Sequence, residues 1–117
     1  MVITFLYSNG LYFYIVRLNK HDTYVNALSE VLQSQYDIIL TNVPLYSKRH
    51  RLIAEIDILA LLGREYDVYE VKCSHRITKA RKQLSRIRKL LTSIRHTYFY
   101  CGSSNELVLV RNYVKSR

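Results

Sequence analysis

Apolar positions in the first third of the chain change from the period of strands to that of a helix. Residues 2–7 and 11–18 are rich in β-branched and aromatic side chains, and Asn9-Gly10 between them suits the positive φ angles of a type I′ turn. This pattern predicts an N-terminal β-hairpin. An apolar stripe at helical spacing follows and predicts a helix that begins near Asp22 or Thr23. Its members are Tyr24, Ala27, Leu28, Val31 and Leu32.

The remainder of the chain predicts three strands, a long helix and two further strands. The strands are expected at residues 37–43, where Pro44 ends the run, at Leu52–Leu62 and at residues 66–73. A helix is expected at residues 78–95, followed by strands at 97–101 and 107–110. The expected fold class is therefore α/β, with an αβββαβ core around a mixed central sheet, an N-terminal β-hairpin and a C-terminal strand.

The length of 117 residues, with no internal repeat or linker, predicts a single domain. Within it we expect the hairpin at residues 1–20, the core at 21–102, and a strand and tail at 103–117. No apolar run approaches the ~18–20 residues needed to cross a bilayer. Residues 1–18 also lack the basic start of a signal peptide. We therefore expect a soluble cytoplasmic protein with no membrane partner.

Positive charge is concentrated in one part of the chain. Lys and Arg total 18 against nine Asp and Glu, and residues 71–105 contain no acidic side chain. Nine basic residues fall in that stretch: Lys72, Arg76, Lys79, Arg81, Lys82, Arg86, Arg88, Lys89 and Arg95. The distribution favours nucleic acid as the partner. A solvated basic face and attraction to anionic lipid are the alternatives.

Neither the cysteines nor the histidines have the spacing of a zinc site. Cys73 and Cys101 are the last residues of two predicted strands that we expect to be parallel neighbours, so a disulfide is one possibility. Buried thiols are the expected state in a reducing cytoplasm. The histidines are expected at the surface or in packing roles: His21, His50, His75 and His96.

Acidic side chains gather where two predicted strands meet. Strict alternation places Glu55, Asp57 and Leu59 on one face of Leu52–Leu62, and Ile56, Ile58 and Ala60 on the other. On the next strand, Val68, Glu70 and Lys72 share a face. If the turn at Gly63 makes the strands antiparallel, Asp57 and Glu70 converge beside Lys72. Two adjacent carboxylates repel each other, and a Mg²⁺ ion held by hard oxygen ligands would relieve that repulsion.

Asp57, Glu70, Val71 and Lys72, within the run EIDILALLGREYDVYEVK, resemble the motif of the PD-(D/E)xK nuclease superfamily. The predicted αβββαβ order is also similar to that of the superfamily, and the layout is most like the archaeal and viral Holliday junction resolvases. The resemblance covers residues 23–101. It departs from the pattern where Ile56 replaces the proline of the motif. Ile87, four residues after Gln83, also stands where some exonuclease-type members have tyrosine.

The resemblance implies a DNA endonuclease that uses Mg²⁺ or Mn²⁺ and cleaves Holliday junctions or other branched DNA. Asp57, Glu70, the Val71 carbonyl and Glu30 would hold the metal, and Lys72 would position the attacking water or stabilise the phosphate. Glu55 is the second choice for the role of Asp57. Glu70–Lys72 as an ordinary charge pair remains an alternative. So do a non-catalytic DNA-binding or regulatory protein that keeps this fold, and a nicking or end-processing nuclease that is not a resolvase.

Two basic segments are candidates for contact with DNA phosphates: the loop residues Lys48, Arg49 and Arg51, and the helix residues Lys79, Lys82, Arg86 and Lys89. No helix-turn-helix or zinc-finger spacing indicates base readout. The aromatic residues of the hairpin (Tyr7, Tyr12, Phe13 and Tyr14) suit either core packing or a two-fold interface. We expect a homodimer, because a four-way junction needs two symmetric cuts.

Overall fold

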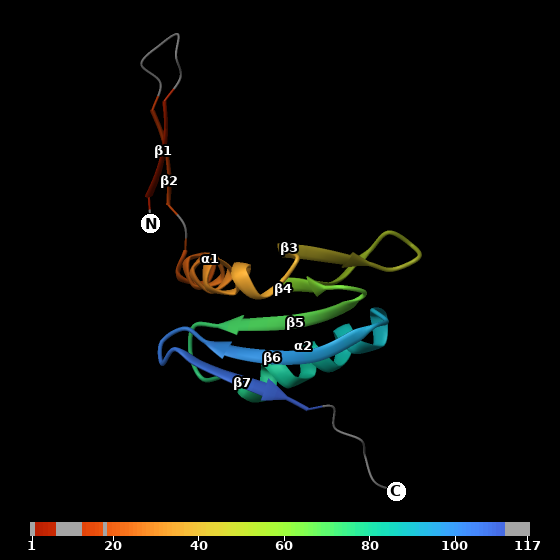
Figure 1. Ribbon diagram of the computed structural model, residues 1–117. Coiled ribbons are helices and arrows are strands. Elements are labelled where there is room, and N and C mark those ends of the chain that lie inside the picture. Colours follow the sequence, from red (N-terminus) through yellow and green to blue (C-terminus); the bar gives the residue numbers. More distant parts are fainter. Residues whose placement is uncertain (1, 7–12, 18, 112–117) are drawn as a thin grey trace, which may run out of the picture.

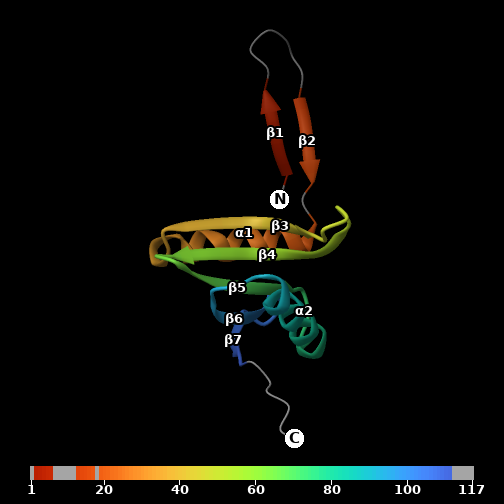
Figure 2. The ribbon, with the colours of Figure 1, turned by 90° about the vertical axis from the view of Figure 1, so that its right-hand side faces the viewer.

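A five-stranded mixed sheet forms the centre of the protein, with one helix packed on each face (Figures 1 and 2). The computed structural model describes residues 2–6, 13–17 and 19–111. The strands are β3 (Ile38–Tyr46), β4 (Leu52–Leu62), β5 (Glu65–Lys72), β6 (Ile94–Cys101) and β7 (Glu106–Val110), and they lie side by side in that order. This arrangement confirms the α/β class and the mixed sheet.

Only β5 and β6 are parallel, and the crossover between them is helix α2 (Ile77–Leu90). The other neighbouring strands pair antiparallel. Helix α1 (Lys20–Leu32) and a short 3₁₀ turn (Gln33–Gln35) precede the sheet. Among the described residues, no helix has the length and apolarity needed to span a membrane.

The predicted N-terminal hairpin is present as β1 (Val2–Leu6) paired antiparallel with β2 (Phe13–Arg17), a two-stranded sheet of its own. The turn residues Asn9 and Gly10 lie outside the described residues, as do Tyr7 and Tyr12. The dimer interface expected on this hairpin stays a prediction.

Helix α1 begins earlier than the sequence pattern indicates. Asn19 is its N-cap, and the Asn19 side chain accepts a hydrogen bond from the backbone N–H of Asp22 at 2.8 Å. The buried stripe consists of Val25, Leu28, Ser29 and Leu32. Leu28 and Leu32 confirm part of the predicted stripe, whereas Ala27 and Val31, which were also predicted to belong to it, are exposed. The face is set by packing against Ile58, Ala60, Tyr69 and Val71, which are distant in the sequence.

Three predicted strand or helix limits were also wrong. Strand β3 runs through Pro44, because β3 is an edge strand and can tolerate a missing N–H donor. Helix α2 ends at Leu90 and not at Arg95, because Leu91 is extended and Ser93 has a φ of 65°. The residues after Ser93 pair with β5, so β6 begins at Ile94.

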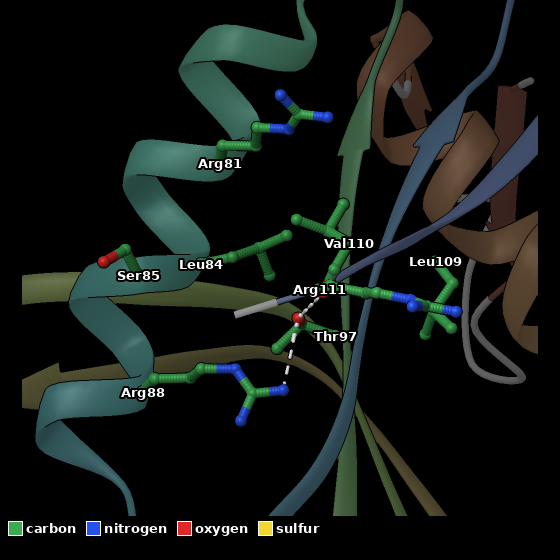
Figure 3. A pocket seen from close by; sticks show the side chains of 8 residues that line it. All are labelled: Arg81, Leu84, Ser85, Arg88, Thr97, Leu109, Val110 and Arg111. Atoms are coloured by element: carbon green, nitrogen blue, oxygen red, sulfur yellow. Dashed lines mark hydrogen bonds between the residues drawn. The ribbon is translucent and has the colours of Figure 1, made fainter. Parts of the chain in front are cut away.

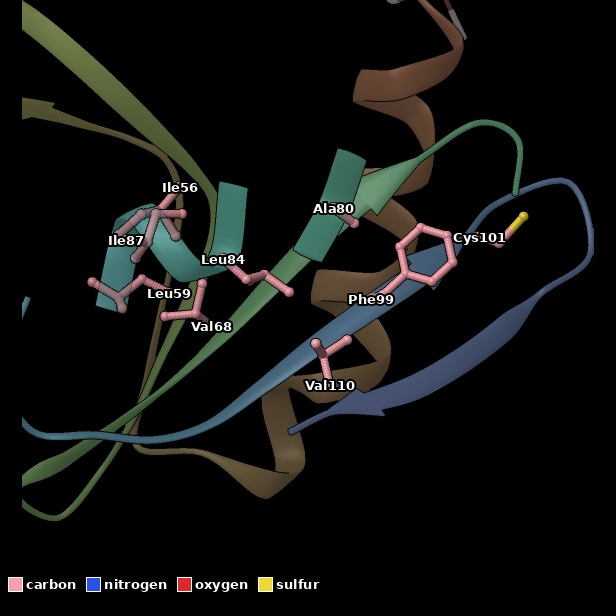
Figure 4. Close-up of a cluster of buried hydrophobic side chains, with 9 residues drawn as sticks. All are labelled: Ile56, Leu59, Val68, Ala80, Leu84, Ile87, Phe99, Cys101 and Val110. Carbon is pink, nitrogen blue, oxygen red and sulfur yellow. The ribbon is translucent and has the colours of Figure 1, made fainter. Parts of the chain in front are cut away.

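The two faces of the sheet carry separate apolar cores. Helix α2 packs Ala80, Leu84 and Ile87 against side chains from β4, β5 and β6 that include Ile56, Val68 and Phe99 (Figure 4). Helix α1 packs on the opposite face over β4 and β5. Both helices are thereby held at fixed positions relative to β4 and β5, the strands that carry the candidate site.

Asp67 is the centre of a buried polar cluster near the start of β5. The carboxylate is 1% exposed, receives a bidentate contact from Arg95 at 3.0 and 2.7 Å, and accepts from the Tyr36 hydroxyl at 2.5 Å. The backbone N–H of His96 adds a fourth donor. Burial raises the pKa of Asp67, but the hydrogen bonds from Arg95 and Tyr36 outweigh this effect and hold the pKa below its usual value.

Replacing Asp67 by Asn is expected to lower the free energy of unfolding by about 2–3 kcal/mol, because charged hydrogen bonds are lost inside the fold. Since the folded pKa lies below the unfolded one, this stability is present above the unfolded pKa and declines as pH falls through the folded pKa. Urea denaturation at neutral and acidic pH measures both effects. Glu65→Gln, at an exposed position of β5, is the matched control. Equal losses in the two variants would contradict this role.

Candidate active site

The pairing between strands β4 and β5 ends next to Asp57, where the two strands separate. Their paired residues run from Ile58–Tyr69 to Leu62–Glu65, and the first half of β4 continues beside β3 alone. The alternation of side chains changes phase at the same point, because Ile56 packs on the α2 face and Ile58 on the α1 face. On the neighbouring strand β3, Val43 pairs with Ile56 and Thr41 pairs with Ile58. Asn42, between these two residues, has a φ of 53°.

This change of phase corrects the predicted faces of β4. Ile56 shares the α2 face with Leu59, whereas strict alternation places it with Ile58 and Ala60. A left-handed backbone conformation such as that of Asn42 interrupts the regular pleat, which accounts for the break. As a result Asp57 lies at an irregular point of the strand.

The side chain of Asp57 extends from β4 to β5 at the point of separation. It is 7% exposed, and its Oδ2 accepts a hydrogen bond from the backbone N–H of Val71 at 2.8 Å. Glu70 is 2% exposed, and its Oε1 lies 3.2 Å from Nζ of Lys72. The structure therefore brings together the three residues of the predicted motif: Asp57, Glu70 and Lys72.

The pair of carboxylates has an unusual electrostatic state. Burial, together with the nearby charge of Asp57, raises the pKa of Glu70 to about 8, although Lys72 acts in the opposite direction. Oε2 of Glu70 is buried and has no hydrogen-bond partner among the described residues. A buried acceptor without a partner is costly, and a cation or a proton at this position removes the cost.

His21, in the first turn of α1, is the site residue that the sequence analysis missed. Its Nε2 lies 3.1 Å from the carbonyl oxygen of Val71 and 3.3 Å from Oδ2 of Asp57. The prediction of a surface or packing histidine was therefore incomplete. In the sequence, the only indication of this role was the position of His21 at the start of the helix that precedes the sheet. No sequence motif relates a histidine at that position to Asp57.

Two predicted acidic residues do not join the cluster. Glu30 is exposed and lies nine residues after His21 on α1, which corresponds to about 13 Å along the helix axis. Glu55 is also exposed, and it lies opposite Pro44 of the edge strand. Asp57 is thus the buried acid of β4, and His21 is the α1 residue beside it.

The predicted DNA-contact residues are all exposed. Lys48, Arg49 and Arg51 lie in the loop between β3 and β4, where the Ser47 hydroxyl accepts hydrogen bonds from the N–H groups of Arg49 and Arg51. Lys79, Lys82, Arg86 and Lys89 lie along the solvent side of α2. Both groups are available to a charged partner.

The two cysteines lie on the adjacent strand ends that were predicted, but both are free thiols. Cys101 pairs with Lys72 across the parallel ladder, and the carbonyl of Cys73 accepts from the N–H of Ser103 at 3.1 Å. Cys101 is buried in the α2-side core, whereas Cys73 is half-buried.

Gly102 holds helix α1 close to the end of β6. A Cβ atom added at this position would overlap the ring of Tyr24, three residues after His21. Gly102→Ala is expected to displace Tyr24 and the first turns of α1, with a loss of about 1–3 kcal/mol of unfolding free energy from overpacking. Thermal unfolding tests this prediction, and Ser103→Ala at the next, exposed position is the control. Unchanged stability in Gly102→Ala would show that α1 does not depend on this contact.

The donor set at the strand separation suits a hard divalent cation. Asp57, Glu70 and the Val71 carbonyl offer oxygen ligands of the kind that Mg²⁺ and Mn²⁺ prefer. Nε2 of His21 is a hydrogen-bond donor to two of these oxygens and is not counted among the ligands. The unpartnered Oε2 of Glu70 is the observation that favours this fit. Within the described ranges, no group of three or more His, Cys, Asp and Glu side chains has metal-binding spacing, so the set depends on the backbone carbonyl.

Comparison with models of known protein families and with curated proteins finds no match for this chain. Function therefore has to be inferred from the chemistry of the site itself.

Proposed function

We propose that this protein is a metal-dependent DNA endonuclease of the PD-(D/E)xK type that acts on branched DNA. The observation that carries the proposal is the buried pair of Asp57 and Glu70, with Lys72 3.2 Å from Glu70, at the separation of β4 and β5. Asp57 is held by the Val71 N–H and Glu70 by Lys72, but the buried Oε2 of Glu70 is left without a partner among the described residues. Uncompensated groups of this kind are concentrated at functional sites.

In this proposal, Asp57, Glu70 and the Val71 carbonyl would hold the metal, and His21 would orient Asp57 and the carbonyl by donating from Nε2. A bound Mg²⁺ ion lowers the pKa of a water molecule and neutralises charge that develops on the scissile phosphate. Lys72 contributes a positive charge and hydrogen-bond donors, with which it orients the attacking water or a phosphate oxygen. The backbone of Val71 fixes Asp57 through the 2.8 Å hydrogen bond, so the carboxylate needs no reorganisation during the reaction.

Binding of DNA through its phosphates is supported by the charge distribution, and the choice of branched DNA comes from the resemblance to Holliday junction resolvases. The loop residues Lys48, Arg49 and Arg51 and the exposed lysines and arginine of α2 suit contacts to phosphates, which position a substrate without reading its sequence. Two symmetric cuts in a four-way junction require two active sites, so a homodimer is part of the proposal.

The test is incubation of end-labelled four-way junction, flap and linear duplex DNA with the protein in Mg²⁺, in Mn²⁺ or in EDTA. We expect the junction to be cut faster than the duplex with either metal, and no cleavage in EDTA. Binding of all three DNAs without cleavage in any metal would refute catalysis and favour a non-catalytic DNA-binding protein. Equal cleavage of all three would refute selection of branched DNA.

A further inference from the structure

A cavity of about 560 Å³ lies between helix α2 and the edge of the sheet at β6 and β7 (Figure 3). Three arginines line it: Arg81 and Arg88 from α2, and Arg111 just after β7. The hydroxyl groups of Ser85 and Thr97 complete the polar wall, and Leu84 and Val110 form part of the apolar wall. We call this cavity the arginine groove.

The charges of the arginine groove have no counterion within the described residues. No carboxylate lines the cavity, and none of the salt bridges there involves Arg81, Arg88 or Arg111. Three guanidinium groups around one cavity repel each other, because each keeps its charge at any pH at which the protein is folded. The arrangement therefore favours a bound anion.

Arg88 is the best-positioned of the three. Its Nη2 donates to the Thr97 hydroxyl at 3.5 Å, and Thr97 donates in turn to the carbonyl of Val110 at 2.6 Å (Figure 3). Nε of Arg88 is buried and has no acceptor among the described residues. A buried charged donor without an acceptor is costly, and an anion oxygen in the groove would supply one.

The arginine groove continues into a second basic hollow on the same helix. That hollow, of about 610 Å³, shares Arg81 and Ser85 with the groove and is otherwise lined by Lys82, Arg86 and Lys89. Positive charge thus extends around α2 without interruption, which suits a chain of phosphates better than a single small anion.

The distance to the candidate active site also suits a nucleic acid. Thr97, in the wall of the groove, lies three residues before Tyr100 on β6, and Tyr100 pairs with Val71 of the site. Three residues span about 10 Å along a strand. That length corresponds to about three base-pair steps of duplex DNA at 3.4 Å each.

We propose that the arginine groove binds a backbone phosphate of DNA, about 10 Å along β6 from the candidate active site. Arginine suits this role because its planar guanidinium can make two parallel hydrogen bonds to phosphate oxygens. The inference rests on the proposed binding of DNA but not on cleavage. It adds Arg81, Arg88 and Arg111 to the contact residues expected on the solvent side of α2.

The test is fluorescence anisotropy of a labelled four-way junction in EDTA at several salt concentrations. Arg88→Gln removes the charge but keeps a donor for Thr97, and Arg111→Gln changes an exposed residue of the groove. Each is expected to reduce the slope of log K against log salt by about 0.9, the value for one phosphate contact on duplex DNA. Arg64→Gln, in the exposed turn between β4 and β5, removes the same charge elsewhere and is expected to leave the slope unchanged.

Equal slopes in Arg88→Gln, Arg111→Gln and the wild type would overturn the proposal. An equal reduction of the slope in Arg64→Gln would also overturn it, because the effect would then come from the net charge of the protein and not from the groove. A parallel arm measures thermal unfolding with inorganic phosphate at constant ionic strength. Stabilisation that is lost in Arg88→Gln, together with an unchanged slope on DNA, would assign the groove to free phosphate and overturn the assignment to DNA. Absence of DNA binding by the wild type would refute both this inference and the proposed function, whereas binding without cleavage would refute catalysis alone.

Discussion

Asp57→Asn and Glu70→Gln are each expected to reduce cleavage of a four-way junction by about 10³-fold or more, while binding of the junction persists. Each substitution keeps the shape of the side chain and removes one negative charge from the proposed metal site. Loss of one well-placed electrostatic group in an active site commonly costs about 10²–10³ in rate, and loss of a metal ligand also lowers the amount of metal bound. Single-turnover cleavage in Mg²⁺ measures the rate, and anisotropy in EDTA measures binding.

Two other acidic residues provide controls for this experiment. Glu55 belongs to the same strand as Asp57 and Glu30 to helix α1, and both side chains are exposed. Glu55→Gln and Glu30→Gln are expected to cleave at rates within a few-fold of the wild type. Normal activity in Asp57→Asn together with an inactive Glu55→Gln would transfer the role to Glu55. Full activity in both Asp57→Asn and Glu70→Gln would refute the assignment of the site.

The central part of the site was predictable because it depends on local pattern. Strand β4 has the predicted bounds Leu52–Leu62, since a long apolar run ends at a clear turn signal at Gly63. A short turn forces the two flanking strands to be antiparallel neighbours, and this brings Asp57 near Glu70. Lys72 follows because it lies two residues from Glu70 on the same strand.

The remainder of the site depends on contacts between distant segments, which a single sequence does not reveal. His21 reaches Val71 because α1 lies across the sheet, in a phase that Leu28, Leu32 and their partners on β4 and β5 determine. The same phase turns Val31 and Glu30 to solvent. The irregularity at Asn42 and Asp57 was missed as well, because strict alternation is the default for a strand and Asn is only one of several residues that tolerate a positive φ.

The buried cluster around Asp67 shows the same limit. Tyr36, Asp67 and Arg95 come from three separate segments and meet only in the folded sheet. Arg95 was assigned to the end of α2 because its neighbours keep helical spacing. The bidentate contact with Asp67 and the pairing of Ile94 with Tyr66 place it in β6 instead. Tertiary contacts therefore override local propensity at this boundary.

Glu70→Gln is also expected to change how the stability of the metal-free protein depends on pH. The pKa of Glu70 is raised from 4.5 to about 8 by burial and by Asp57. A raised carboxyl pKa means that the folded state holds its proton more tightly than the unfolded chain. The wild type therefore loses stability as pH rises from about 4.5 to about 8, and the loss is complete above that range. Gln carries no charge, so the variant lacks this term.

The expected result is that Glu70→Gln is more stable than the wild type at pH 8 to 9 in EDTA, and that the difference disappears near pH 4.5. Addition of Mn²⁺ at neutral pH is expected to stabilise the wild type, by about 2.7 kcal/mol at a concentration of about 100 times Kd. The variant is expected to gain much less, because one ligand is missing. Thermal and urea unfolding measure both effects, with Glu65→Gln on the same strand as the control. A variant that is less stable than the wild type at every pH would show that the Glu70–Lys72 pair stabilises the fold. That result would contradict the proposal that Glu70 is a metal ligand whose charge is uncompensated in the metal-free protein.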